Sequence, residues 1–249
     1  MTFLPVPDRS LELEVIFCVQ TVSSPLLANI YLHYAFDLWV EAWRKKCAQG
    51  DVIVIRYADD TVLGFQHQAE ADRFLQDLRE RLGKFGLELH PDKTRRIEFG
   101  RSAETSRKRR EEGKPETFDF LGFTHICGKT RDGAFTVRRQ TISKRMRAKL
   151  QEIKQQLQRR MHEPVPQTGK WLQSVVQGYF NYHAVPGNLD RLGDFRARVT
   201  RFWRRTLRRR GQRRPINWAR LHRLAERWLP RPRVLHPYPA QRFAATHPR

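Results

Sequence analysis

The chain has 249 residues, 39% of them hydrophobic and 11% aromatic, so it can bury a core and is not globally disordered. Its formal charge of +22 indicates a polyanionic partner. The charge is uneven, because residues 1–119 contain 18 basic and 20 acidic residues whereas residues 120–249 contain 30 and 6. The first part is typical of an ordinary globular domain, and the second part is typical of a surface for phosphates.

The sequence predicts no membrane span, disulfide framework or structural zinc site. It has no run of 18 or more apolar residues and no signal peptide. Cys18, Cys47 and Cys127 are scattered without a C-x-x-C pair. We therefore expect small buried cysteines in a reducing compartment, and a soluble, cytoplasmic protein.

The first 65 residues predict one helix and one hairpin. Residues 1–21 have no clear period, so no element is assigned to them. Ser24 is a good N-cap and Pro25 fits the first helical position. The apolar stripe that continues this helix to about residue 46 consists of Leu27, Ile30, Tyr34 and Leu38. Two apolar runs at 52–55 and 61–65 then predict strands joined by a tight connection.

The rest of the first half continues the mixture of helices and strands, and the second half changes to a helical period. We expect a helix at 70–85 ended by Gly86, short strands at 87–90 and 95–99, a surface loop or mobile linker at 100–116, and paired strands at 118–123 and 135–137. From residue 138 onward three apolar stripes predict three helices, and a fourth, short helix runs from Trp218 to Trp228. The predicted core includes Ile53, Val62, Leu78, Leu82 and Leu121.

The most informative motif is Tyr57-Ala58-Asp59-Asp60, which lies between the two predicted strands. Two adjacent carboxylates at a hairpin tip cannot both be buried without a cation, because like charges this close raise each other's pKa or require a metal. Hard oxygen ligands of this kind suit Mg²⁺, which proteins hold with one or two carboxylates plus substrate phosphates. The alternative is an ordinary Asp-rich turn exposed to water, and only the surrounding sequence separates the two.

Several segments, taken in order, resemble the reverse transcriptase of a bacterial group II intron with its maturase region. These segments are 24–32, 56–60, 86–94, 118–123, 178–183 and 244–249. The resemblance implies an α+β fold. Residues 22–137 would form a partial palm, in which helices flank an antiparallel sheet. Residues 138–249 would form an all-α, RNA-binding thumb or maturase domain. The resemblance also implies RNA-directed DNA polymerisation and assistance to intron splicing.

The resemblance assigns roles to particular residues. Asp59 and Asp60 would be catalytic and would bind Mg²⁺ in two-metal phosphoryl transfer. The residues that would contact the nucleotide or primer are Tyr57, Lys93, Leu121 and Gly122. For Tyr57 the alternative is packing beneath the hairpin, and for Lys93 it is a solvated turn. The resemblance implies a primer-supporting strand at Phe120, Leu121 and Phe123, but we expect these residues mainly to pack in the core.

Two departures from the family occur upstream of the predicted helix. The third metal-binding carboxylate of the family lies on a strand before Ser24, where this chain offers only Asp8, in a setting typical of a solvated turn. Residues 18–21 replace a nucleotide-pocket segment and lack both of its glycines, which permit close backbone approach. We therefore expect an N-terminally truncated reading frame without the fingers and first half of the palm, which a separate chain could supply.

The predicted helix around residue 200 carries the expected RNA affinity. Between Arg191 and Arg214 the sequence has 11 arginines and one acid, Asp194. The arginines alternate with an apolar stripe, which leaves one face for packing and one for phosphates. The predicted RNA-binding residues are Arg198, Arg201, Arg205, Arg208 and Arg209. Trp203, Trp218 and Trp228 are expected in the core rather than as base-stacking platforms.

Two hypotheses from different classes remain open. In the first the chain is an RNA-directed DNA polymerase that works on its intron RNA and on an RNA/DNA primer–template with Mg²⁺. In the second it is a catalytically inactive maturase remnant that only binds intron RNA. The missing third carboxylate separates them, because a constellation that lacks one metal ligand loses most of its rate. A decayed product without function is the third alternative.

Overall fold

The computed structural model describes residues 12–17, 25–210 and 216–238. Asp8, Ser24 and the segments 18–21 and 244–249 therefore lie outside the described residues. The chain divides into two compact units, one made of residues 1–120 and 126–137 and the other of 121–125 and 138–249. Helices alternate with small antiparallel sheets, which confirms the predicted α+β class.

The first unit is built on a four-stranded antiparallel sheet of order β2-β3-β1-β4. Its strands are β1 (Glu12–Phe17), β2 (Val52–Tyr57), β3 (Asp60–Phe65) and β4 (Arg95–Arg96). The sequence predicts no element at 1–21, but β1 pairs with β3 along its whole length. Local sequence patterns do not predict this strand, because its position in the sheet depends on pairing with residues about fifty positions away.

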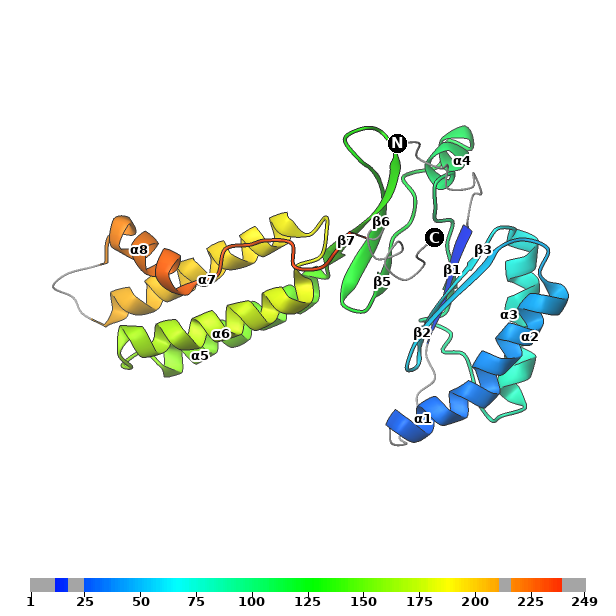
Figure 1. Cartoon of the computed structure of the whole chain (residues 1–249), viewed down its shortest axis with the longest axis horizontal. Helices are drawn as coiled ribbons and strands as arrows, with labels where there is room; N and C mark the ends of the chain where they lie inside the picture. The colour runs from blue at the N-terminus through cyan, green and yellow to red at the C-terminus, as the bar shows by residue number, and fades with distance from the viewer. Residues whose placement is uncertain (1–11, 18–24, 211–215, 239–249) are drawn as a thin grey trace. The chain divides into compact units, whose positions relative to one another are not determined.

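Helices cover one face of this sheet (Figure 1). They are α1 (Pro25–Leu32), the π-helical segment η1 (His33–Asp37), α2 (Leu38–Cys47) and α3 (Gln68–Gly83). Aromatic rings form the centre of the core beneath them, where Phe74 lies 4.9 Å from Trp43 and 5.1 Å from Phe65 between ring centroids. The helix predicted at 70–85 and the hairpin predicted at 52–65 are confirmed.

The core predictions hold for three residues and fail for two. Val62, Leu78 and Leu82 are buried, but Ile53 is exposed and Leu121 is only half-buried. In β2 every second side chain points away from the helices, so Val52 and Val54 pack on the core while Ile53 does not. Leu121 lies in a turn instead of a strand.

The apolar stripe predicted for the first helix faces solvent. Leu27, Ile30, Tyr34 and Leu38 are exposed, whereas the core takes the alternative stripe of Leu32, Phe36, Val40 and Trp43. The segment is apolar on both sides, so periodicity identifies the helix but not its buried face. The first unit therefore exposes apolar surface along this helical segment.

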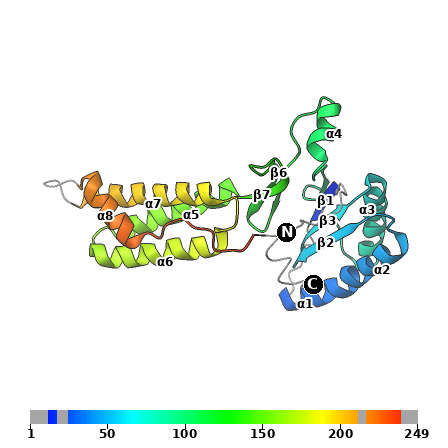
Figure 2. The same cartoon turned by 45° about the horizontal axis from the view of Figure 1, so that its top comes forward.

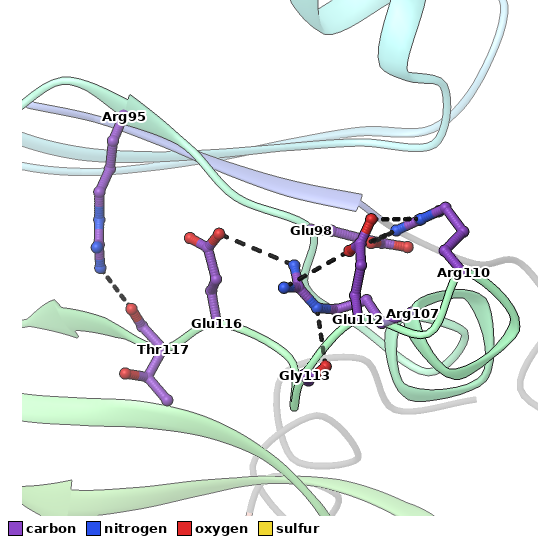
Figure 3. A network of polar contacts seen from close by, with 8 residues as sticks. All are labelled: Arg95, Glu98, Arg107, Arg110, Glu112, Gly113, Glu116 and Thr117. Carbon is purple, nitrogen blue, oxygen red and sulfur yellow. Dashed lines mark hydrogen bonds and ion pairs between the residues drawn. The ribbon is translucent and has the colours of Figure 1, made fainter.

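Residues 87–90 form no strand, and the predicted loop at 100–116 contains helix α4 (Ala103–Arg109). Ion pairs hold the segment together (Figure 3). Arg107 contacts Glu112 at 3.6 Å and Glu116 at 3.8 Å, and Arg110 pairs with Glu98 and Glu112. These acidic side chains pair with two of the four basic residues at 107–110, Arg107 and Arg110.

A second sheet has the order β5-β6-β7. Its strands are β5 (Phe118–Phe120), β6 (Phe123–Lys129) and β7 (Phe135–Thr141). The predicted pairing of 118–123 with 135–137 is wrong, because β6 lies between β5 and β7 and extends over residues for which the sequence predicts no strand. The predicted strand at 118–123 is interrupted, because Leu121 and Gly122 both have left-handed backbone conformations, with φ of 46° and 82°. Gly133 provides the left-handed residue of the next turn, with φ of 80°.

The second unit is mainly helical, with α5 (Ser143–Arg159), α6 (Val165–His183), α7 (Leu189–Arg209) and α8 (Trp218–Trp228) packed together (Figure 2). Trp203 is fully buried and Trp228 packs on the core, as predicted. Trp218 is 47% exposed, so its prediction as a core residue is wrong. It is the first residue of α8, and its side chain lies outside the buried face that Leu221 and Ala225 form. No helix among the described residues has the length and apolar character needed to cross a membrane.

Candidate catalytic hairpin and nucleic-acid interface

The hairpin of β2 and β3 places Asp59 at its tip. Tyr57 pairs with Asp60, so Ala58 and Asp59 alone form the turn. Ala58 has a left-handed backbone conformation with φ of 54°, which a two-residue hairpin turn requires but which is uncommon for a residue other than glycine. Such strain persists only where surrounding contacts maintain it, and it is concentrated at functional sites.

Arg56 supplies those contacts. Its Nη1 donates to the carbonyl oxygen of Ala58 at 2.8 Å and to Oδ1 of Asn29 at 2.9 Å. Its Nε and Nη2 donate to the two carboxylate oxygens of Asp37, each at 2.7 Å. One guanidinium group therefore connects the hairpin tip to α1 and to the end of η1 through a bidentate, charge-assisted pair.

We call these contacts of Arg56 with Asn29, Asp37 and Ala58 the Arg56 clamp. The sequence gives only a weak signal for it. Arg56 is the one charged residue in an otherwise apolar strand beside the motif, and Asn29 and Asp37 are eight residues apart along one helical segment. Asp37 ends the π-helical stretch, and such stretches occur frequently at functional sites. None of these three residues is among the predicted site residues, although their contacts fix the position of the tip.

The side chain of Tyr57 is 64% exposed, so it does not pack beneath the hairpin. It shares the sheet face opposite the helices with Ile55 and with its partner in register, Asp60. Asp59 is exposed and Asp60 is half-buried. Tyr57 and Asp60 thus lie on the same face of the sheet as the exposed side chains of Ile53 and Ile55.

The donor set at the tip fits Mg²⁺ in part. Two adjacent carboxylates, from Asp59 and Asp60, match the one or two that proteins commonly use to hold Mg²⁺ together with substrate phosphates. Across the sheet, backbone register pairs Asp60 with Phe17, while Glu14 of β1 pairs with Leu63, further from the tip. In the described parts of the chain no group of three His, Cys, Asp or Glu side chains could hold a metal ion.

The other predicted nucleotide or primer residues lie in two turns. Lys93 is exposed in the turn at 91–93, and its backbone N–H donates to the carbonyl oxygen of His90 at 3.2 Å. Leu121 and Gly122 form the turn between β5 and β6 and belong to the second unit. There Tyr182 donates its hydroxyl to the carbonyl oxygen of Leu121 at 2.7 Å, so a residue absent from the predicted site holds this strained turn.

Helix α7 separates its apolar and basic residues. Leu192, Phe195, Val199 and Trp203 are fully buried and form the core stripe. The five arginines predicted to bind RNA are all exposed: Arg198, Arg201, Arg205, Arg208 and Arg209. None of the five forms an ion pair with another residue of the described chain. Their positive charge is therefore available to an external anion.

Comparison with protein families gives a match over the first part of the chain. Residues 21–125 match the family model of Reverse transcriptase (RNA-dependent DNA polymerase). The reverse transcriptase match contains the Arg56 clamp, the hairpin tip and the turns of Lys93 and Gly122, and it supports a reverse transcriptase domain over these residues. A search of curated proteins gave no match to the chain.

Proposed function

We propose that this chain is a group II intron reverse transcriptase/maturase chain that binds its intron RNA through the arginine face of α7. The observation that carries the proposal is the stripe of five exposed arginines without ion-pair partners in the described chain, backed by the buried stripe of the same helix. Guanidinium groups match phosphate geometry, and structured RNA is recognised largely through shape, phosphates and 2′-hydroxyls. A reverse transcriptase domain in the same chain as such a helix favours RNA over other polyanions.

In the enzymatic form of the proposal, the hairpin tip is the polymerisation site. Asp59 and Asp60 would hold Mg²⁺, which when bound lowers the pKa of the primer hydroxyl and stabilises the leaving pyrophosphate. Tyr57 and Lys93 are proposed to contact the nucleotide or the primer, as is the turn of Leu121 and Gly122. Arg56 is a positioning residue, because it holds the backbone of Ala58 and does not itself belong to the carboxylate pair.

A second candidate function is an RNA-binding protein without polymerase activity. The register of β1 favours it, because the strand beside the hairpin pairs Phe17, an apolar residue, with Asp60. The two acids of β1, Glu12 and Glu14, pair with Phe65 and Leu63. Among the described residues, no third His, Cys, Asp or Glu side chain joins Asp59 and Asp60 in a group that could hold a metal ion. RNA binding by α7 is common to both candidates.

RNA binding is tested by a filter-binding titration at three salt concentrations. We expect the affinity for a structured intron RNA to fall about tenfold or more between 50 and 200 mM salt. Replacing Arg205, Arg208 and Arg209 together by Gln should weaken binding and reduce the slope of log affinity against log salt by about 2.

A matched control removes the same charge elsewhere. Arg44, Arg73 and Arg79 are exposed on α2 and α3, so their joint replacement by Gln also lowers the net charge by three. This control should leave the salt slope within about 0.5 of the parent value. Equal loss in both triple variants would contradict the proposal that α7 is the RNA surface.

Primer extension separates the two candidates. On an RNA template with Mg²⁺ we expect this chain alone to give no detectable extension, because a metal site short of one ligand loses most of its rate. Robust extension that disappears in Asp59→Ala would establish the enzymatic form instead. The filter-binding result is independent of this outcome.

A further inference from the structure

A basic cleft lies between the end of α7 and the start of α8. It encloses about 640 Å³, which is within the usual range for a ligand site. Its lining consists of one aromatic and five basic side chains: Arg201, Arg204, Arg205, Arg208, Arg209 and Trp218. No acidic side chain contributes to this lining, so the cleft favours an anionic ligand.

The aromatic side chain of the cleft is held in place by its neighbours. Asn217 caps α8, accepting a hydrogen bond at 2.9 Å from the backbone N–H of Arg220, and this fixes Trp218 as the first residue of the helix. The guanidinium carbon of Arg204 lies 3.9 Å from the centre of the indole ring. The Nε of Arg204 is buried and has no hydrogen-bond partner among the described residues.

An exposed tryptophan among arginines suits a ligand that combines phosphate with a flat ring. Five guanidinium groups could bind phosphate without an aromatic neighbour. The indole of Trp218 therefore indicates a ligand that carries a flat ring as well as phosphate. Unpaired bases stack on aromatic rings and on arginine planes, and such stacking is tolerant of base identity. The 47% exposure of Trp218 leaves ring surface for a base even with Arg204 in place.

We propose that this cleft binds an unpaired nucleotide of a nucleic-acid strand. The base stacks against the exposed surface of the Trp218 ring that Arg204 leaves open, and the neighbouring phosphates contact Arg201, Arg205 and Arg208. The inference rests on the proposed RNA-binding function of α7 and adds a preference for single-stranded segments. It assigns Trp218 the stacking role that its sequence position alone does not reveal.

The test compares four ligands at one salt concentration by competition binding: a 12-nucleotide single-stranded RNA, the same sequence as DNA, an RNA duplex of equal length, and inorganic polyphosphate. Two variants change the ring, Trp218→Leu removing it and Trp218→Phe keeping an aromatic face. Tyr238→Leu is the matched control, since Tyr238 is 54% exposed in the same unit and lies outside the cleft lining. Circular dichroism checks that each variant is folded.

We expect Trp218→Leu to weaken single-stranded RNA and DNA binding about 5- to 100-fold, because stacking one base is worth roughly that factor. Duplex RNA and polyphosphate should change less than about twofold, and Trp218→Phe should recover most of the loss. An equal loss for polyphosphate, or no loss for single strands, would overturn the stacking site. If α7 still binds structured RNA in that case, the proposed function stands; if the parent chain binds no nucleic acid, both fail.

Discussion

Arg56→Met tests whether the clamp fixes the hairpin tip. The substitution keeps much of the side-chain bulk but removes four hydrogen bonds, two to Asp37, one to Asn29 and one to the carbonyl oxygen of Ala58. It also removes the guanidinium partner of Asp37, whose carboxylate retains the Nδ1 of His33 at 3.4 Å. The turn at Ala58 then lacks the contact that maintains its left-handed backbone.

The expected magnitude follows from burial. The side chains of Arg56 and Asp37 are 16% and 31% exposed, so the pair is intermediate between surface pairs and fully buried ones. Surface pairs contribute up to about 1 kcal/mol, and removing one partner of a buried pair costs about 3–5 kcal/mol. We therefore expect Arg56→Met to reduce the opening free energy of the hairpin by about 2–3 kcal/mol, or about 30- to 150-fold in exchange rate.

The assay is amide hydrogen exchange, followed by mass spectrometry of peptides that cover β2 and β3. Local exchange is preferable to a global melt because two compact units need not unfold in one step. Arg73→Met is the matched control, since its side chain is 63% exposed and its Nε lies 3.9 Å from Asp77. We expect this control to change the opening free energy by less than about 0.5 kcal/mol.

A double variant, Arg56→Met with Asp37→Leu, measures the coupling directly. Removing both charges should cost less than the sum of the single changes, by about 1–2 kcal/mol, because no unpaired charge then remains. If Arg56→Met exchanges within threefold of the parent and of the Arg73 control, Arg56 does not hold the hairpin.

Two further predictions concern the second unit. Gly169→Ala should lower the opening free energy of α6 by about 1–3 kcal/mol in amide hydrogen exchange, since the new Cβ would lie 2.7 Å from the ring of Trp228. Gly178→Ala, in the same helix with nothing within 4 Å, should be neutral or stabilise it by up to about 1 kcal/mol, and equal effects would refute the packing argument. Burial, with repulsion from Arg145, lowers the pKa of His183 from 6.5 to about 4. Between these values the unfolded chain binds a proton that the folded chain does not, so the stability should decrease as the pH is lowered from 6.5 to about 4. Urea titrations at several pH values should show a weaker dependence in His183→Gln.

The sequence by itself predicts the elements whose cause is local. Two apolar runs around Tyr57-Ala58-Asp59-Asp60 predict the hairpin because strand formation and a tight turn depend on neighbouring residues. The arginine face of α7 is equally predictable, since one helical period assigns the apolar and basic residues to opposite sides.

Only the tertiary structure decided the features that depend on distant partners. β1 has its place because β3 offers a free edge, and the first helix buries Phe36 instead of Tyr34 because the sheet lies on that side. Arg56 meets Asp37 across 19 positions of the chain, and Trp218 stays exposed at the start of α8. In each case the residue types permit more than one arrangement locally, and the contact that selects one arrangement comes from elsewhere in the fold.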